Sequence, residues 1–175
     1  MTFSYPFEPI PPEDPGAAGK DPLVRHAYQG AVTSADAYRG LRQVVRFDQH
    51  VLRLGNRFVA RDRYREIAFV ALGNAATSMS LGLVQALGER VTQGFIAGPE
   101  EPPAEVPFRF LPLRPNSFGA AASTEICSSV LELAQGLGAR DLLLVLLSAG
   151  ALEALALPPT GLSGGAWSEW LASLQ

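Results

Sequence analysis

The stretch EIAFVALGNAA at residues 66–76 joins a short apolar run to a glycine turn. An almost continuous apolar run of this length is typical of a strand that is buried on both faces of a parallel sheet. Apolar residues then recur on one helical face up to Leu87, and Gly88 supplies a stop signal. The sequence therefore predicts a strand over 66–72, a tight turn at Gly73 and a helix over 76–87.

Strand and helix patterns continue to alternate after this helix. Two strands are predicted over 91–97 and 108–113, and a helix begins near Ser123 and ends at Gly138. A last apolar strand covers 142–147. Because parallel strands need crossover helices, this alternation predicts an α/β protein with a doubly wound, mostly parallel, Rossmann-like sheet and helices on both faces.

The residues before the first buried strand predict two further elements. A stripe of apolar residues over 23–45 predicts a long helix, and alternation over 47–59 around Leu54-Gly55-Asn56 predicts a small β-hairpin. Residues 1–22 contain six prolines, which remove backbone donors and favour an extended arm. We therefore expect an arm over 1–22 and a single domain over 23–175, a length that one hydrophobic core can serve.

Composition excludes several classes of function. A net charge of −3 and a pI near 5.4 give no basic surface for nucleic acid. His26 and His50 are too far apart in sequence to form a zinc site, and the lone Cys127 predicts a packed thiol rather than a disulfide. The N-terminus lacks a signal-peptide pattern, and the longest apolar run, 142–147, is too short to cross a bilayer. We expect a cytoplasmic protein without metal or membrane contact.

Two loops follow predicted parallel strands, at the edge of the sheet where ligands bind in this class of fold. The first contains Gly73, Asn74 and Ala75, and the second contains Ser148, Ala149 and Gly150. The pair predicts a site for a small anionic ligand, although Gly73 also has a purely structural explanation, because glycine lets a strand turn sharply into a helix.

Across most of residues 23–165 the chain resembles the N-terminal domain of the ATP-dependent glycerate 2-kinases. The resemblance is carried by Ala71 to Met79, Val130 to Leu133, Leu146 to Ala151 and Leu157 to Ser163. It implies a doubly wound N-terminal domain. It also implies ATP and Mg²⁺ as cofactors if the activity of the family is retained.

The same resemblance implies that catalysis has been lost. The lysine of the family's first loop falls on Asn74, a neutral amide that cannot supply a charge to phosphoryl transfer. Three glycines of the family fall on Ala149, Gly150 and Ala151, and a Gly-His-Pro segment falls on Pro115-Asn116-Ser117, which makes Asn116 a further candidate contact. The chain also ends at Gln175, where the resembled kinases continue into a second domain. We therefore expect a catalytically inactive domain and assign no catalytic residue.

Other functions stay open at this point. A separate polypeptide that supplies the second domain would give an active phosphotransferase. A sugar-phosphate-binding domain is a further alternative, although Thr77-Ser78 and Ser80 only partly provide the hydroxyl clusters that its loops need.

Near the C-terminus, apolar residues recur at helical spacing and predict either docking on the domain itself or a face for self-association or a protein partner. These residues are Trp167, Trp170, Leu171 and Leu174. The arginines at 53, 57, 61, 63 and 65 predict a solvated surface that is ion-paired with Asp62 and Glu66.

Overall fold

The computed structural model describes residues 30, 35–48, 50–113, 120–155, 161, 163, 165–167 and 169. The chain divides into two units, residues 1–35 and residues 36–175. Only Gly30 and Ala35 of the first unit are described, so the predicted arm and most of the predicted helix over 23–45 lie outside the described residues. Everything below concerns the second unit.

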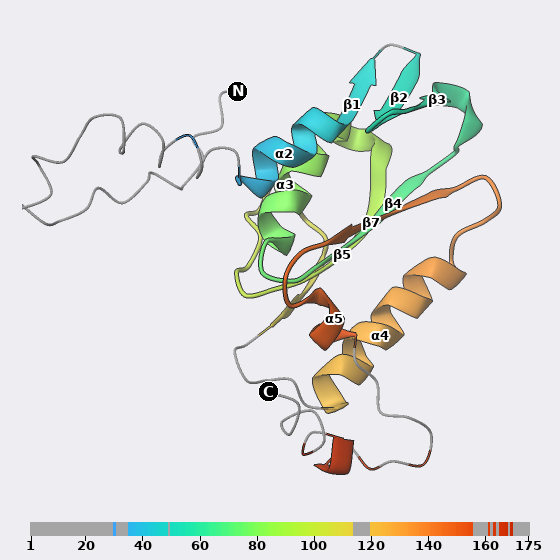
Figure 1. The fold of residues 1–175 in the computed structure, drawn as a ribbon. Helices are drawn as coiled ribbons and strands as arrows, with labels where there is room; N and C mark the ends of the chain where they lie inside the picture. Colours follow the sequence, from blue (N-terminus) through green and yellow to red (C-terminus); the bar gives the residue numbers. More distant parts are fainter. Residues whose placement is uncertain are drawn as a thin grey trace, which may run out of the picture. The chain divides into compact units, whose positions relative to one another are not determined.

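Four parallel strands form the central sheet of this unit in the order β6-β5-β4-β7 (Figure 1). Every residue of β4 is buried, because the strand has neighbours on both sides and helices over both faces. The first strand in sequence therefore lies inside the sheet, and the predicted doubly wound α/β fold is confirmed. The strands are β4 (Ile67–Leu72), β5 (Val91–Gly98), β6 (Arg109–Pro112) and β7 (Leu142–Leu147).

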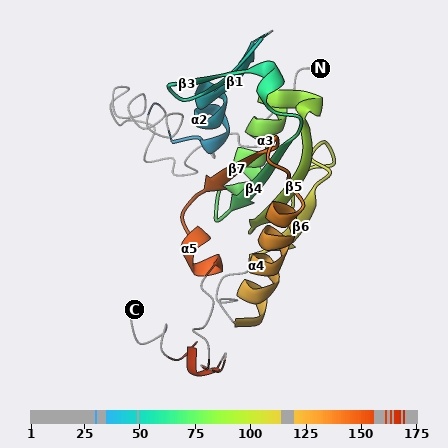
Figure 2. The same cartoon turned by 90° about the vertical axis from the view of Figure 1, so that its right-hand side faces the viewer.

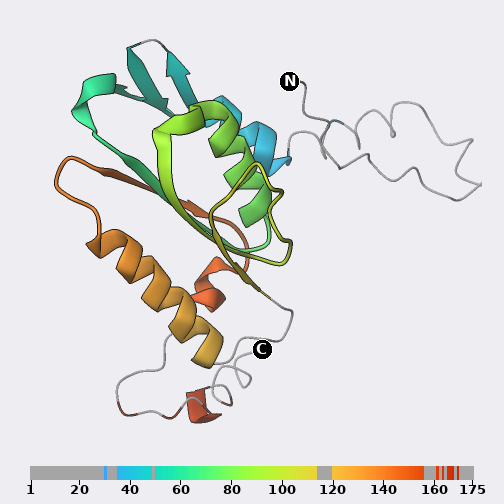
Figure 3. The ribbon, with the colours of Figure 1, turned by 180° about the vertical axis from the view of Figure 1, so that it is seen from behind.

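Helices cover both faces of the sheet. On one face, α3 (Ala76–Leu87) packs Leu83 and Leu87 against Phe69 of β4, and η3 (Gly88–Arg90) leads from this helix into β5. On the other face, α4 (Ala120–Gln135) and α5 (Ala151–Ala154) pack against Val70 and Leu72. Seen from behind, the sheet runs between α3 and α4 (Figure 3).

A second, antiparallel sheet precedes the parallel one (Figure 2). The predicted hairpin turns at Gly55 and Asn56, but the small sheet has three strands instead of two, because β1 pairs with β2. Its elements are α2 (Ala37–Val44), β1 (Val45–Asp48), β2 (Val51–Leu54), β3 (Arg57–Ala60) and η2 (Arg61–Arg63).

Two predicted helix ends are wrong by a few residues. The helix expected to run through Val45 ends at Val44, since Val45 has an extended backbone and is buried as the first residue of β1. The helix expected to end at Gly138 ends at Gln135, where the amide of Gly136 donates to Glu132 O. Among the described helices, none has both the length and the apolar character needed to span a bilayer.

Candidate functional site

The order of the strands places a topological switch point between β4 and β7. The chain leaves β4 through α3 on one face of the sheet, and it enters β7 from α4 on the other face. In open parallel sheets the ligand crevice lies outside the carboxyl ends of the strands at such a point. The two loops predicted from sequence follow β4 and β7 at this place.

Two hydrogen bonds join these loops, and a third ties the second loop to the end of β4. The amide of Asn74 donates to Ala149 O at 2.8 Å, and the amide of Ala75 donates to Ser148 Oγ at 3.0 Å. The Ser148 hydroxyl donates in turn to Leu72 O at 3.2 Å. The structure thus brings together six of the seven candidate residues, 73–75 and 148–150, which we call the loop junction.

Gly73 allows the close approach of the two loops. Its φ is +104°, a conformation that side chains rarely adopt. A Cβ atom at this position would lie 2.6 Å from Ala149 O and 2.7 Å from Ser148 O. Gly73 is therefore needed for the close contact between the two loops, and this structural role does not depend on a ligand.

The amides of the first loop are all used inside the protein. In an anion-binding loop, successive amides at the start of a helix point at the ligand. Here all four amides of 73–76 donate to protein acceptors, so none is left for an anion. The acceptors, in order, are Ala97 O at 3.0 Å, Ala149 O at 2.8 Å, Ser148 Oγ at 3.0 Å and Gly73 O at 3.1 Å.

The second loop keeps groups that can meet a ligand. The amides of Ala149 and Gly150 donate to no acceptor among the described residues, and Ala149 is exposed. The exposed side chain of Asn74 lies beside them, since a Cβ built on Gly150 would be 3.3 Å from Asn74 Oδ1. Two amides and one carboxamide can therefore hydrogen-bond a small polar ligand.

Other candidate residues are only partly placed. Asn116 lies outside the described residues, as do Trp170, Leu171 and Leu174. Trp167 is half-buried, and its amide donates to Ser163 O at 3.0 Å. The predicted C-terminal face is therefore not tested.

The described residues just after the strands, which we call the carboxyl edge, contain no arginine or lysine. These residues are 73–75, 99–101, 113 and 148–150, and their charged members are Glu100 and Glu101. The segments before the strands, which we call the amino edge, place an arginine within two residues of the start of every strand. These arginines are Arg65, Arg90, Arg109 and Arg140.

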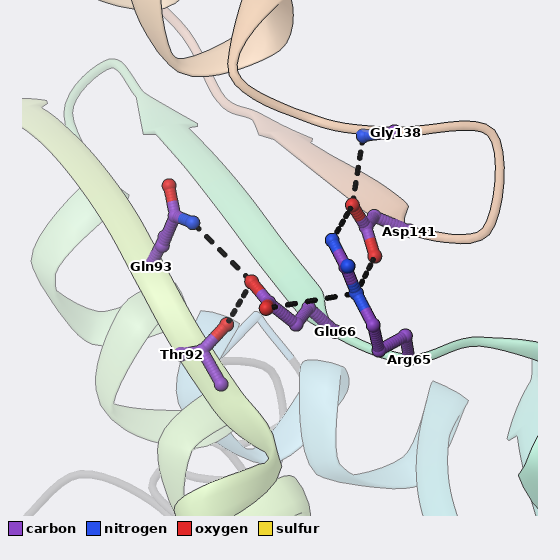
Figure 4. Close-up of polar contacts among 6 residues, drawn as sticks. All are labelled: Arg65, Glu66, Thr92, Gln93, Gly138 and Asp141. Atoms are coloured by element: carbon purple, nitrogen blue, oxygen red, sulfur yellow. Dashed lines mark hydrogen bonds and ion pairs between the residues drawn. The ribbon is translucent and has the colours of Figure 1, made fainter.

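An ion-pair network ties the amino edge together (Figure 4). Arg65 donates from Nε to Asp141 Oδ1 at 3.2 Å and from Nη2 to Oδ2 at 3.0 Å, and the amide of Gly138 donates to Oδ2 at 2.7 Å. Glu66 accepts from Gln93 at 3.3 Å and from Thr92 at 3.4 Å. The network connects residues next to β4, β5 and β7.

The charges of this network shift two pKa values. The amide of Gly138 and the guanidinium of Arg65 hold the pKa of Asp141 below its ordinary value, against the opposing effect of desolvation. Asp141 in turn raises the pKa of Arg65. Sequence reasoning paired Arg65 with its neighbours in the chain and missed Asp141. The available signal was an arginine at or just before the start of every parallel strand.

Cys127 and the acidic side chains form no cluster of metal ligands in the described part of the chain. Cys127 is half-buried, its thiol lies 3.7 Å from Leu155 O, and burial raises its pKa. Within the described ranges, no cluster of three or more His, Cys, Asp or Glu side chains is arranged to hold a metal ion.

A known structure shares this fold, and a second one matches less closely. The PH0495 protein from Pyrococcus horikoshii OT3 matches 82% of the chain with a TM-score of 0.69 and 18% identity, over 32% of its own length. A glycerate kinase from Thermotoga maritima matches 62% of the chain with a TM-score of 0.45 and 25% identity, over 26% of its length. The chain thus spans about a third of the first protein and about a quarter of the second. No curated protein sequence matches the chain significantly.

Residues 23–174 match the family described as a domain of unknown function, DUF4147. This domain is the N-terminal domain of glycerate kinase-like proteins, so the resemblance predicted from sequence is confirmed. The match covers most of the chain, and the protein belongs to the DUF4147 family.

Proposed function

We propose that this chain is a glycerate-kinase-related domain that binds a small carboxylate weakly at the loop junction and does not transfer phosphoryl groups. The observation that carries the proposal is the use of all four amides of 73–76 as donors to the protein itself. The amides of this loop cannot turn toward a phosphate without breaking the bonds that hold it to the loop after β7 and to the end of β5.

Electrostatics support the absence of phosphoryl transfer. Catalysis of that reaction depends mainly on fixed positive charge around the transferred group. Asn74 stands where the resembled kinases carry lysine, and the described residues of the carboxyl edge add Glu100 and Glu101 without any cation. The backbone of Glu100 lies at the first turn of α3, because its carbonyl accepts from Thr77. The described part of this edge therefore offers no positive charge to a polyphosphate.

A single carboxylate suits the groups that stay open. Its two oxygens accept hydrogen bonds from the amides of Ala149 and Gly150, and the Asn74 carboxamide can donate to a neighbouring hydroxyl. Glycerate, the substrate named for one of the similar structures, has this combination of carboxylate and hydroxyl groups. Without a cation, we expect a dissociation constant of about 1 mM or weaker.

Amide NMR of the full chain tests the proposal. Titration with glycerate should shift the amide signals of Ala149 and Gly150 and the side-chain signals of Asn74. A coupled assay for ADP with glycerate, ATP and Mg²⁺ should give no turnover. Release of ADP would support an active phosphotransferase instead, and shifts caused by sugar phosphates but not by glycerate would support a sugar-phosphate-binding domain.

Variants of Asn74 sharpen this test. Asn74→Ala should weaken glycerate binding about threefold, and Asn74→Lys should strengthen it about fivefold, because a charged donor bonds a carboxylate more strongly than a neutral one. Gln135→Ala is the matched control, since Gln135 is an exposed amide side chain at the far end of α4. Equal effects of Asn74→Ala and Gln135→Ala would contradict binding at the loop junction.

A further inference from the structure

A cavity of about 250 Å³ lies at the amino edge of the parallel sheet. Its lining comes from all three strands of the antiparallel sheet, from η3 and from the starts of β4 and β5. The cavity is therefore found where the two sheets meet, and the loop junction follows the opposite ends of the parallel strands. Its volume is close to the lower end, about 300 Å³, of the range of small-molecule sites.

Part of the lining is apolar. Leu52 and Ile67 are buried, and Phe47 and Tyr64 are half-buried. Sites for small molecules combine such aliphatic and aromatic walls with a few placed polar groups. This part of the cavity suits an apolar or aromatic group of a ligand.

Arg90 supplies a guanidinium that the protein holds in place but does not use up. Its Cζ lies 3.9 Å from the centroid of the Phe47 ring, a cation–π contact, and its Nη1 donates to Leu87 O at 3.3 Å. Its Nε and Nη2 donate to no acceptor among the described residues, and no described carboxylate lies within ion-pair distance. Because arginine binds a carboxylate through two parallel hydrogen bonds, this side of the guanidinium can hold one.

Glu89 adds the opposite charge to the same lining. It is exposed, and in the described part of the chain it pairs neither with Arg90 nor with another cation. Arg65, the remaining charged residue of the lining, is already paired with Asp141 (Figure 4). The cavity thus presents one cation and one anion that no described side chain balances.

We propose that this cavity binds a free amino acid with an apolar side chain. The α-carboxylate accepts hydrogen bonds from Nε and Nη2 of Arg90, and the α-ammonium pairs with the carboxylate of Glu89. The side chain of the ligand packs among the apolar residues of the lining. A simple carboxylate would leave Glu89 without a partner, and a simple amine would leave Arg90 without one, so the cavity favours the zwitterion over both. This site goes beyond the proposed function, because it uses no residue of the loop junction.

Amide NMR of the full chain, with phenylalanine as the probe, tests the proposal. Phenylalanine should shift the amide signals of Tyr64 and Thr92, which line the cavity, and leave those of Ala149 and Gly150 unchanged. Hydrocinnamate lacks the ammonium and phenethylamine lacks the carboxylate, so each should bind about threefold to tenfold more weakly. Equal affinity for the three compounds, shifts confined to the loop junction, or no shift at up to about 10 mM phenylalanine would overturn the inference.

Two variants assign the two charges of the ligand to their partners. Arg90→Gln should weaken phenylalanine binding about tenfold and abolish the preference for phenylalanine over phenethylamine. Glu89→Gln should weaken it about threefold and abolish the preference over hydrocinnamate. A general loss of structure would not remove a different preference in each variant. Preferences that survive in both variants would overturn the inference.

Exposed charges outside the cavity provide the controls. Arg46 precedes Phe47 in β1 and points to the opposite face of the strand, so Arg46→Gln should bind like the native chain. Glu105→Gln, at an exposed glutamate, is the control for Glu89→Gln. Circular dichroism should show that Arg90→Gln folds; if it does not, Arg90→Lys replaces it and should weaken binding about threefold, because it keeps the charge and loses the fork. Controls that weaken binding as much as the cavity variants would overturn the inference.

Discussion

The amino and carboxyl edges of the parallel sheet are held together by different groups. At the amino edge, an ion pair between Arg65 and Asp141 joins the starts of β4 and β7, in addition to the bond from the amide of Arg65 to Arg140 O at 2.8 Å. At the carboxyl edge, backbone amides and the hydroxyl of Ser148 join the ends of the same two strands. Main-chain bonds thus join this pair of strands at both ends, and an ion pair adds to them only at the amino edge among the described residues.

This difference explains why the carboxyl edge is a poor place for phosphate chemistry. The amides that a phosphate would need are the ones that hold β4 and β7 together, so binding and folding compete for them. The amino edge has cations, but Arg65 is already paired there with Asp141, and Arg109 with Glu132. Breaking each edge separately should therefore give effects of different size and different pH dependence.

Gly73→Ala should have the largest effect on stability. The added Cβ would lie 2.6 Å from Ala149 O at a φ of +104°, so either the two loops separate or the backbone adopts a strained conformation. We expect a loss of about 3 kcal/mol in the free energy of unfolding, measured with urea.

Gly55→Ala is the matched control for backbone conformation. Gly55 also has a positive φ, +58°, but a Cβ there would meet only Val44 at 3.9 Å. The variant should lose about 1 kcal/mol. Equal losses in the two variants would mean that conformation, and not the contact between the loops, makes Gly73 necessary.

Ser148→Ala should have an intermediate effect. The hydroxyl accepts from the amide of Ala75 and donates to Leu72 O, so its removal leaves a partly buried amide without an acceptor. We expect a loss of about 2 kcal/mol. Ser129→Ala should cost less than about 1 kcal/mol, because the Ser129 hydroxyl bonds only Glu125 O within the same helix. A loss no larger than that of Ser129→Ala would contradict the role of Ser148 in joining the loops.

The sequence predicted β4, α3 and the turn between them because each has a local cause. An apolar run of six residues fits only a strand that is covered on both faces, and Gly73 marks the turn. The sequence also placed both loops at one edge of the sheet, since parallel strands end there together. It could not predict which amides stay open, because their acceptors, such as Ala97 O and Ala149 O, come from segments distant in sequence.

The errors at element ends have a similar origin. Val45 continues the apolar spacing of the preceding helix, so periodicity alone extends the helix into β1, and only the pairing with β2 decides otherwise. Arg65 and Asp141 are 76 positions apart, and no local pattern relates their side chains. At Val45, pairing with β2 outweighs the local preference for a helix. Between Arg65 and Asp141, the contact arises only from the tertiary fold and leaves no local pattern in the sequence.

Asp141→Asn should lower the free energy of unfolding less than Gly73→Ala or Ser148→Ala. The pH dependence of its effect distinguishes the amino edge from the carboxyl edge. The folded state holds the pKa of Asp141 below its ordinary value, so the ionised carboxylate stabilises the protein above about pH 4. This contribution is lost as the pH falls through the lowered pKa. Urea unfolding should show the variant less stable than the native chain at pH 7, with a difference that shrinks as the pH falls below about 4. Ser148→Ala should show a difference that does not depend on pH.

Glu132→Gln provides the control for charge at the amino edge. Its carboxylate lies 3.4 Å from Arg109 Nη1, but both side chains are exposed, so solvent screens the pair and the loss should stay below about 1 kcal/mol. The side chain of Asp141 is only 1% exposed and accepts an additional backbone amide, which makes its ionised form harder to replace. If Glu132→Gln removed as much acid-dependent stability as Asp141→Asn, general surface charge would hold the amino edge, and the network around Arg65 would have no special part in it.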